Sequence, residues 1–191
     1  HDIDYARWGL GVETHPSYIS AAGGRYLFNN GAEFPDTQQI CFEYPAIGES
    51  DKTRMLIYEE RLWSTNYPHD CDSGVEYYGT KGQMFLSRRG KIEVFLERNK
   101  PHKVDVPNEF QNTADHVADF IDAIRNDRKP NADAEIAHLT TSLCHLGNIA
   151  IRLGKSLNFD PKQERFTNDR EADALLDRTY RDGHWAAPKG V

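Results

Sequence analysis

The side chains best suited to chemistry lie on the segment EIAHLTTSLCHLGNIAIRLG, which has helical periodicity. Its polar residues recur three, four or seven positions apart and would form one stripe of a helix: Glu135, His138, Ser142, His145 and Arg152. Two imidazoles and a carboxylate can bind a metal ion, or place an acid and a base over a pocket. Two helical turns separate His138 from His145 by about 10 Å, whereas zinc lies about 2 Å from its ligands. We therefore favour a pocket-lining role, or hydrogen bonds at a helix–sheet seam, over a metal site of Glu135, His138 and His145.

The first residues, HDIDYARWGLG, hold a second candidate. His1, Asp4 and Trp8 would share one face of a helix that ends near Gly9 and Gly11. A histidine paired with a carboxylate can be held in one tautomer and made more basic, as an acid/base catalyst requires. The alternative is a capping or surface pair at a helix end, and spacing alone favours this alternative.

Other patterns are weaker. The YGTKG stretch at 78–82 is typical of a tight turn rather than of a phosphate site. Arg25, Tyr58, Arg61 and Trp63 could line a sugar-sized pocket, although aromatic residues on strands more often belong to a core or an interface. GLGVET lacks the third glycine of a dinucleotide loop and follows a predicted helix, so we expect no nucleotide site from this chain alone.

The composition of the chain excludes some classes of binding partner. The net charge of the 191 residues is −7 and no block of lysine and arginine stands out, which argues against nucleic acid or an anionic membrane. No apolar run approaches the roughly 20 residues that span a bilayer. The number and spacing of the three cysteines, Cys41, Cys71 and Cys144, do not indicate a disulfide framework. They favour a reducing, cytoplasmic location. An exported enzyme without disulfides is the alternative.

The elements that must position these residues change in type along the chain. Alternation predicts strands over 15–28, 37–45 and 54–64, followed by three short strands within 75–98. Helical spacing then predicts helices over 114–124 and 133–153.

The polar tail that follows carries one short predicted helix near 171–176, and we expect Tyr180 and Trp185 to dock on the domain. This order predicts an α+β fold: a largely antiparallel, open sheet with helices packed on one face. The other face needs a partner if it is apolar.

Several segments, taken in order, resemble the C-terminal half of the Gfo/Idh/MocA oxidoreductases, the family of glucose–fructose oxidoreductase and inositol dehydrogenase. The resemblance covers residues 1–185 and rests on HDIDYARWGLG, GGRYLF followed by PDTQQICFEYP, YYGTKGQMFLSRRG, FIDAIRNDRKPNAD, HLTTSLCHLGNIAIRLGKSLNFDPKQERF and EADALL.

The resemblance implies that an NAD- or NADP-binding Rossmann domain of roughly 120 residues precedes this chain and is absent from it. Residues 1–191 would be one substrate-binding and oligomerisation domain, with 1–11 as the remnant of the active-site helix and 160–191 as a docked tail. The intact protein would oxidise a sugar, polyol or related alcohol with NAD or NADP. We expect the fragment alone to be inactive. A freestanding, non-catalytic binding and oligomerisation module is the alternative.

The resemblance also implies roles for individual residues. The family's active-site helix carries Asp-x-x-x-His followed by x-x-Asp, and His1 and Asp4 match the last two positions. His1 would then be the acid/base for the substrate hydroxyl. Predicted substrate contacts are Asp4, Arg61, His138, His145 and Asn148. The expected partners are a sugar-like small molecule and further copies of the chain, bound through the open sheet face.

Overall fold

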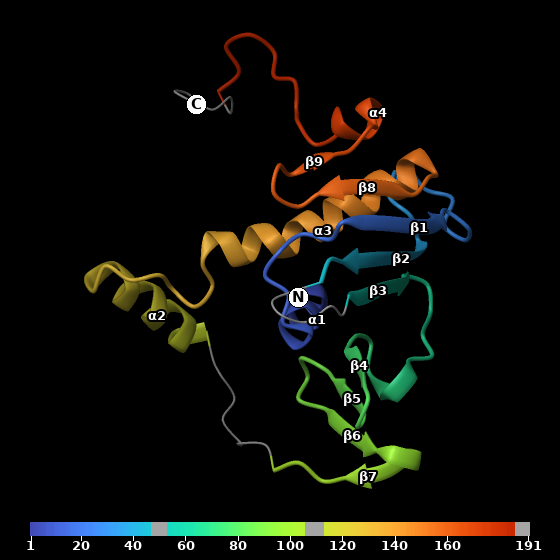
Figure 1. Ribbon diagram of the computed structural model, residues 1–191, viewed down its shortest axis with the longest axis vertical. Helices are drawn as coiled ribbons and strands as arrows, with labels where there is room; N and C mark the ends of the chain where they lie inside the picture. The colour runs from blue at the N-terminus through green and yellow to red at the C-terminus, as the bar shows by residue number, and fades with distance from the viewer. Residues whose placement is uncertain (47–52, 106–112, 186–191) are drawn as a thin grey trace.

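The structure, a computed structural model, describes residues 1–46, 53–105 and 113–185. Four helices and nine strands lie in these ranges (Figure 1). The helices are α1 (Asp2–Leu10), α2 (Thr113–Arg125), α3 (Ala134–Leu153) and α4 (Arg170–Asp173). The strands are β1 (Tyr18–Gly24), β2 (Thr37–Tyr44), β3 (Arg54–Arg61), β4 (Val75–Gly79), β5 (Gly82–Leu86), β6 (Ile92–Leu96), β7 (Lys100–His102), β8 (Leu157–Asp160) and β9 (Arg165–Phe166).

The strands pair antiparallel throughout and form two sheets. One has the order β3-β2-β1-β8-β9 and the other the order β4-β5-β6-β7. The predicted α+β class with antiparallel pairing is confirmed. Ile40, Phe42 and Tyr44 of β2 are buried on one face of the first sheet, as their alternation predicted.

α3 covers that buried face (Figure 1). Leu143, Leu146 and Ala150 of α3 join the strand residues in one core. Gly147 lets the helix approach β2 closely, because an added Cβ there would overlap the end of Ile40. The period of the apolar residues in α3 therefore decides which side of the helix is left for the polar stripe.

α1 connects the two sheets. Its Ile3 and Ala6 are buried in the core under the first sheet. On the other side, the Tyr77 hydroxyl of β4 donates to the Tyr5 carbonyl at 2.5 Å. The tyrosine ring lies so close to Gly9 that an added Cβ would overlap it.

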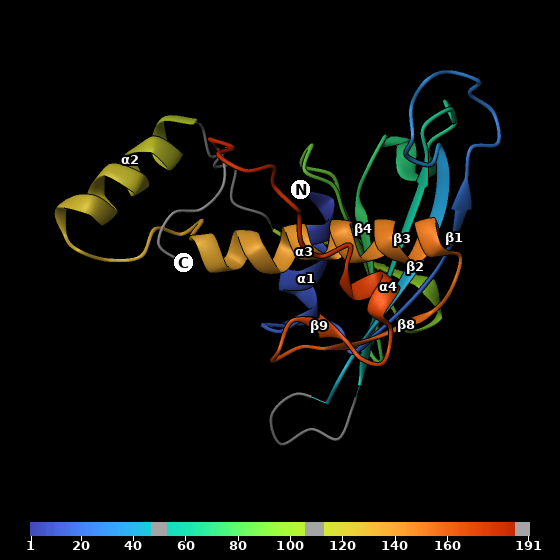
Figure 2. The same cartoon turned by 90° about the horizontal axis from the view of Figure 1, so that it is seen from above.

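α2 has the predicted helical conformation but extends away from both sheets (Figure 2). Of its apolar residues, Ala123 is buried, whereas Phe120, Ile121 and Ile124 are exposed. The helices that pack on the first sheet are therefore α1, α3 and the short α4, which contacts β9. No helix in the described ranges is both long and apolar enough to cross a bilayer.

The tail differs from the prediction at its end. β8 pairs with β1, β9 pairs with β8, and Phe166 and Ala172 are buried against the core. Trp185, however, is 86% exposed and stacks on His184, so the expectation that Trp185 docks is wrong. The last residues of the predicted tail, 186–191, lie outside the described residues.

Candidate functional site

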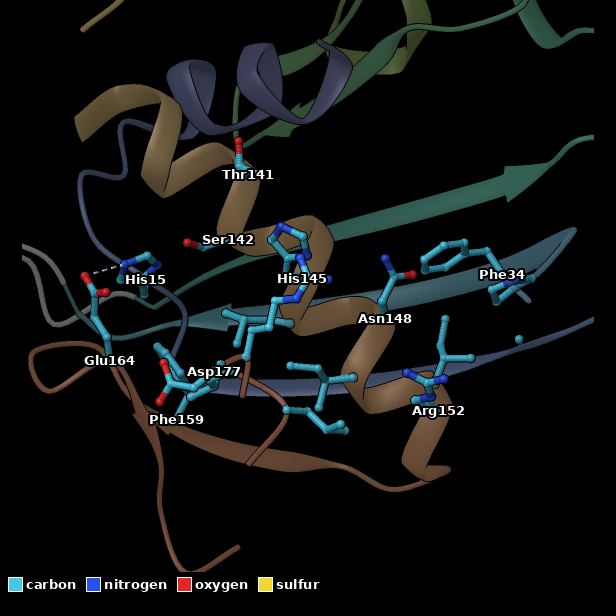
Figure 3. A pocket seen from close by; sticks show the side chains of 18 of the residues that line it. His15, Phe34, Thr141, Ser142, His145, Asn148, Arg152, Phe159, Glu164 and Asp177 are labelled. Atoms are coloured by element: carbon cyan, nitrogen blue, oxygen red, sulfur yellow. Dashed lines mark hydrogen bonds and ion pairs between the residues drawn. The ribbon is translucent and has the colours of Figure 1, made fainter. Parts of the chain in front are cut away.

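A cavity of about 1020 Å³ lies beside α3 (Figure 3). Its walls come from α3, the segment that follows β1, the β8–β9 turn and the segment after α4. The volume is at the upper end of the range for small-molecule pockets.

The polar stripe of α3 forms one wall. His138, Ser142, His145, Asn148 and Arg152 all line the cavity. The helix is fixed at its start by Asp133, whose carboxylate accepts from the Ile136 N–H at 2.9 Å. It ends at Gly154, which has a φ of 63°. Of the predicted stripe, His138, Ser142, His145 and Arg152 line the cavity and Glu135 does not.

Three side chains of this wall are available to a ligand. Within the described part of the chain, no hydrogen bond engages the side chains of Ser142, His145 or Asn148. Figure 3 shows His145 and Asn148 on the same side of α3. An imidazole, an amide and a hydroxyl can both donate and accept, which suits the hydroxyl groups of a sugar or polyol.

The segment after β1 that contributes to the lining is held by Asp36, which sequence reasoning missed. This buried carboxylate accepts from the backbone N–H groups of Tyr26, Leu27 and Phe28 at 2.9–3.1 Å. Burial alone would raise its pKa, but these bonds outweigh burial and hold the pKa well below its usual range. Because the carboxylate anchors this turn, it also helps to place Phe34, which lines the cavity.

At one end of the cavity, His15, His138 and Glu164 form a cluster. The Glu164 carboxylate lies 3.1 Å from His15 Nε2 and 3.0 Å from His138 Nε2. Burial lowers the pKa of His15. Burial also acts to raise the pKa of Glu164, but the hydrogen bonds from the two histidines outweigh it and lower that pKa.

The residues of this cluster differ from those that the sequence suggested for a metal site. Glu135 lies outside the cluster and bonds Lys129 at 3.2 Å. In the residues that the structure describes, the ligand atoms that come within 4.8 Å of one another belong to His15, His138 and Glu164. The grouping of His138 with Glu135 and His145 was wrong. Glu135 pairs with Lys129 and His138 with Glu164, and His145 lies two helical turns from His138. No sequence pattern links His15 to Glu164.

The start of α1 lies next to the cavity-lining turn of α3. Thr140 donates to the Asp4 carboxylate at 2.5 Å and accepts from Arg7 Nε at 3.2 Å. His1 is the exposed N-cap residue, and no hydrogen bond joins it to Asp4 in the described structure. Asp4 therefore belongs to the contact between α1 and α3, one residue along α3 from the cavity-lining Thr141.

The predicted site residues thus fall into separate places. His138, His145 and Asn148 line the cavity, whereas His1 and Asp4 lie on α1. Arg61 ends β3, is exposed, and pairs with Glu59. The structure does not bring Arg61 to the cavity.

Comparisons with known proteins give a family and a fold. A family model described as "Oxidoreductase family, C-terminal alpha/beta domain" matches residues 71–187. A solved structure from Thermotoga maritima has a TM-score of 0.57 and 18% identity over 81% of this chain. UDP-N-acetylglucosamine 3-dehydrogenase GnnA from Acidithiobacillus ferrooxidans has a TM-score of 0.57 and 14% identity over 80%. An oxidoreductase from Agrobacterium radiobacter, solved with NAD+, L-tartaric acid and magnesium, has a TM-score of 0.55 and 14% identity over 82%.

The chain spans less than half of each of these solved chains, namely 43%, 45% and 46%. At these identities the likeness concerns the fold. No curated protein sequence matches the chain.

Proposed function

Because this chain belongs to the Gfo/Idh/MocA oxidoreductase family as its C-terminal alpha/beta domain, we propose that it supplies the substrate-binding part of an NAD(P)-dependent oxidoreductase. The substrate is a sugar, polyol or related alcohol. One similar protein is a nucleotide-sugar dehydrogenase by name, and another was solved with NAD+ and a hydroxy acid. Both support a substrate that carries hydroxyl groups.

The cavity beside α3 is the observation that carries this proposal. Its Ser142, His145 and Asn148 present paired donor and acceptor groups that form no bonds within the described chain, and its volume of about 1020 Å³ accommodates a sugar. His145 and Asn148 are proposed as substrate contacts.

The glycines of the GLGVET segment do not fit the phosphates of a nicotinamide dinucleotide. Gly9 and Gly11 lie at the C-terminal end of α1, where Gly11 has a φ of 62°. Free carbonyl groups face outward at such an end, whereas a pyrophosphate needs the N–H groups of a helix N-terminus. We propose that the cofactor is held by residues outside this chain, where it serves as the hydride acceptor.

This chain then contributes the proton transfer. His1 is exposed at the N-terminus of α1, where its imidazole can take the proton of a substrate hydroxyl. The bonds of Asp4 to α3 fix the helix that carries it. The proposal of His1 as the catalytic base rests on the resemblance of HDIDYARWGLG to the family's active-site helix, since His1 does not line the cavity. Asp4, bonded to α3, is proposed as a positioning residue.

An assay of NAD(P)+ reduction tests the proposal. A protein in which this chain is joined to a nucleotide-binding domain should oxidise at least one member of a panel of sugars and polyols, and the 191-residue chain alone should not. His1→Gln in the intact protein should lower kcat by about 10²–10⁴-fold.

His116→Gln, on the exposed side of α2, is the matched control and should retain activity. Failure of the intact protein to reduce NAD(P)+ with any member of the panel would contradict the proposal. Full activity of His1→Gln would contradict the role of His1.

A freestanding binding module is the second candidate. His1 does not line the cavity. A module that only binds a ligand would need no catalytic base there. Calorimetry of the 191-residue chain with the same panel, alongside its size in extracts of its source, separates the two candidates. Natural occurrence at 191 residues with binding and no turnover would favour the module.

We also propose that the exposed face of the first sheet joins copies of the chain. Met55 and Ile57 lie on that face and are 55% and 52% exposed. Cys41 pairs with Ile57 in the register, and Glu43 pairs with Met55, so the surface continues from β3 onto β2. Exposed apolar side chains on a sheet face, such as Met55 and Ile57, are typical of an interface.

A further inference from the structure

The cluster of His15, His138 and Glu164 has the donor set of a metal site. Three separate segments contribute it: the loop before β1, helix α3 and the β8–β9 turn. Two neutral imidazoles and one carboxylate bind zinc in many enzymes, leaving a fourth position open. The cluster lies at the wall of the cavity, so an open position would face a bound small molecule.

The spacing suits a tetrahedral ion. With metal–ligand bonds of about 2.0–2.2 Å, neighbouring ligand atoms lie about 3.3 Å apart. Glu164 Oε1 is 3.1 Å from the Nε2 atoms of both His15 and His138. The ligand atoms of all three residues lie within 4.8 Å of one another, so small movements of the two half-exposed side chains, His138 and Glu164, would admit the ion.

The protein fixes two of the ligands before any ion binds. His15 is 3% exposed and packs edge-on against the rings of Phe159 and His138. Its Nε2 points at the Glu164 carboxylate. Glu164 adopts a φ of 52°, and its N–H donates to the Asp160 carbonyl at 2.9 Å. A non-glycine residue in this conformation is held there by its surroundings.

Two of the three ligands are partly exposed to solvent, which gives an ion a way into the site. His138 and Glu164 have side chains that are 52% and 48% exposed, so an ion can enter from the cavity side. The Nδ1 atom of His15 is buried and has no partner in the described residues. Metal-bound histidines normally donate that N–H, and the loss of such a bond typically costs about 10- to 100-fold in affinity. The site should therefore bind more weakly than a fully supported one.

We propose that His15, His138 and Glu164 together bind one divalent ion of the zinc class, with an open coordination position toward the cavity. The ion fixes the β8–β9 turn to α3 and offers a Lewis acid to an oxygen of the cavity ligand. Imidazole ligands favour Zn²⁺ over Mg²⁺. Binding of the ion itself does not require the proposed dehydrogenase function, although the site lines the same cavity.

Titration of the chelator-treated chain, without a histidine tag, tests the proposal. Calorimetry with Zn²⁺ should show one ion per chain, and Co²⁺ should give the visible absorption of a tetrahedral site. An excess of Mg²⁺ should not displace Zn²⁺. Absence of saturable binding, or an octahedral Co²⁺ spectrum, would overturn the proposal.

Matched variants assign the binding to the cluster. His138→Ala and Glu164→Gln replace half-exposed side chains and should each weaken Zn²⁺ binding at least about tenfold. His145→Ala, also on α3 and lining the cavity, should leave the affinity within about twofold. Zinc should raise the unfolding temperature of the wild type but not of Glu164→Gln. Equal binding by all three variants would place the ion elsewhere and reject the site.

Discussion

Each ring nitrogen of His69 forms a hydrogen bond with a glutamate carboxylate. Nδ1 lies 2.7 Å from Glu93 and Nε2 lies 2.8 Å from Glu76, while the ring stacks on Phe85. Lys91 completes the group, with its ammonium 3.3 Å from Glu93. The hydrogen bond to Glu93, then that to Glu76, raises the pKa of His69 above its ordinary value of 6.5.

The charged imidazole should therefore stabilise the loop on the second sheet in a pH-dependent way. Its contribution is fully present below about pH 6.5 and is lost as pH rises through the higher pKa of the folded state. As the pH is raised through the pKa of folded His69, the difference in unfolding free energy between the wild type and His69→Gln should become smaller. Urea unfolding at a series of pH values measures it, with His102→Gln on β7 as the control. A difference that stays constant with pH would contradict this role.

At the residue scale, the sequence indicates a functional residue when its neighbours along the chain share the role. His138, His145 and Asn148 follow one helical stripe, and all three line the cavity. His15 and Glu164 are 149 residues apart, and their contact depends on the order of the strands. No local period encodes that order.

At the scale of elements, α1 depends on a close contact with β4. Gly9→Ala should lower the free energy of unfolding by about 1–3 kcal/mol, because the new Cβ would overlap the Tyr77 ring. The helical preference of alanine offsets up to about 1 kcal/mol of this loss. Denaturant titration measures the net change.

A double-mutant cycle separates this contact from other effects. In a Tyr77→Leu background, Gly9→Ala should become nearly neutral, since the ring is gone. An equal loss in both backgrounds would show that Tyr77 is not the cause.

Long elements were predictable and short ones were not. The alternation in β2 and the apolar period in α3 gave both their type and their buried side. β7, β8 and β9 contain two to four residues, too few to show a period, and they pair only because the chain folds back. The helical period of α2 was correct, but no local signal indicated that its apolar side would be exposed.

At the scale of the whole molecule, the exposed face of the first sheet should control association. Ile57→Asp should convert the assembled protein to monomers, because a charge at this position opposes burial of the face. Light scattering after size exclusion measures the mass.

Ile124→Asp on α2 is the matched control, since Ile124 is also exposed, and it should leave the mass unchanged. A monomeric wild type would contradict the predicted interface. Loss of assembly in Ile124→Asp alone would move the interface to α2.

The pairing of β1 with β8 sets the order of events during synthesis. Tyr18 pairs with Asn158 and Ile19 with Leu157, so this end of one edge of β1 stays unpaired until residues 157–158 have been synthesised. β2 and β3 can cover the other edge early, because they follow at once. Ribosomes add about 5–20 residues per second, which leaves the open edge unpaired for on the order of ten seconds. An unpaired strand edge invites pairing with another chain. The nascent polypeptide, rather than the finished domain, is therefore the form most exposed to aggregation, and chaperones that act at the ribosome should matter most for its yield.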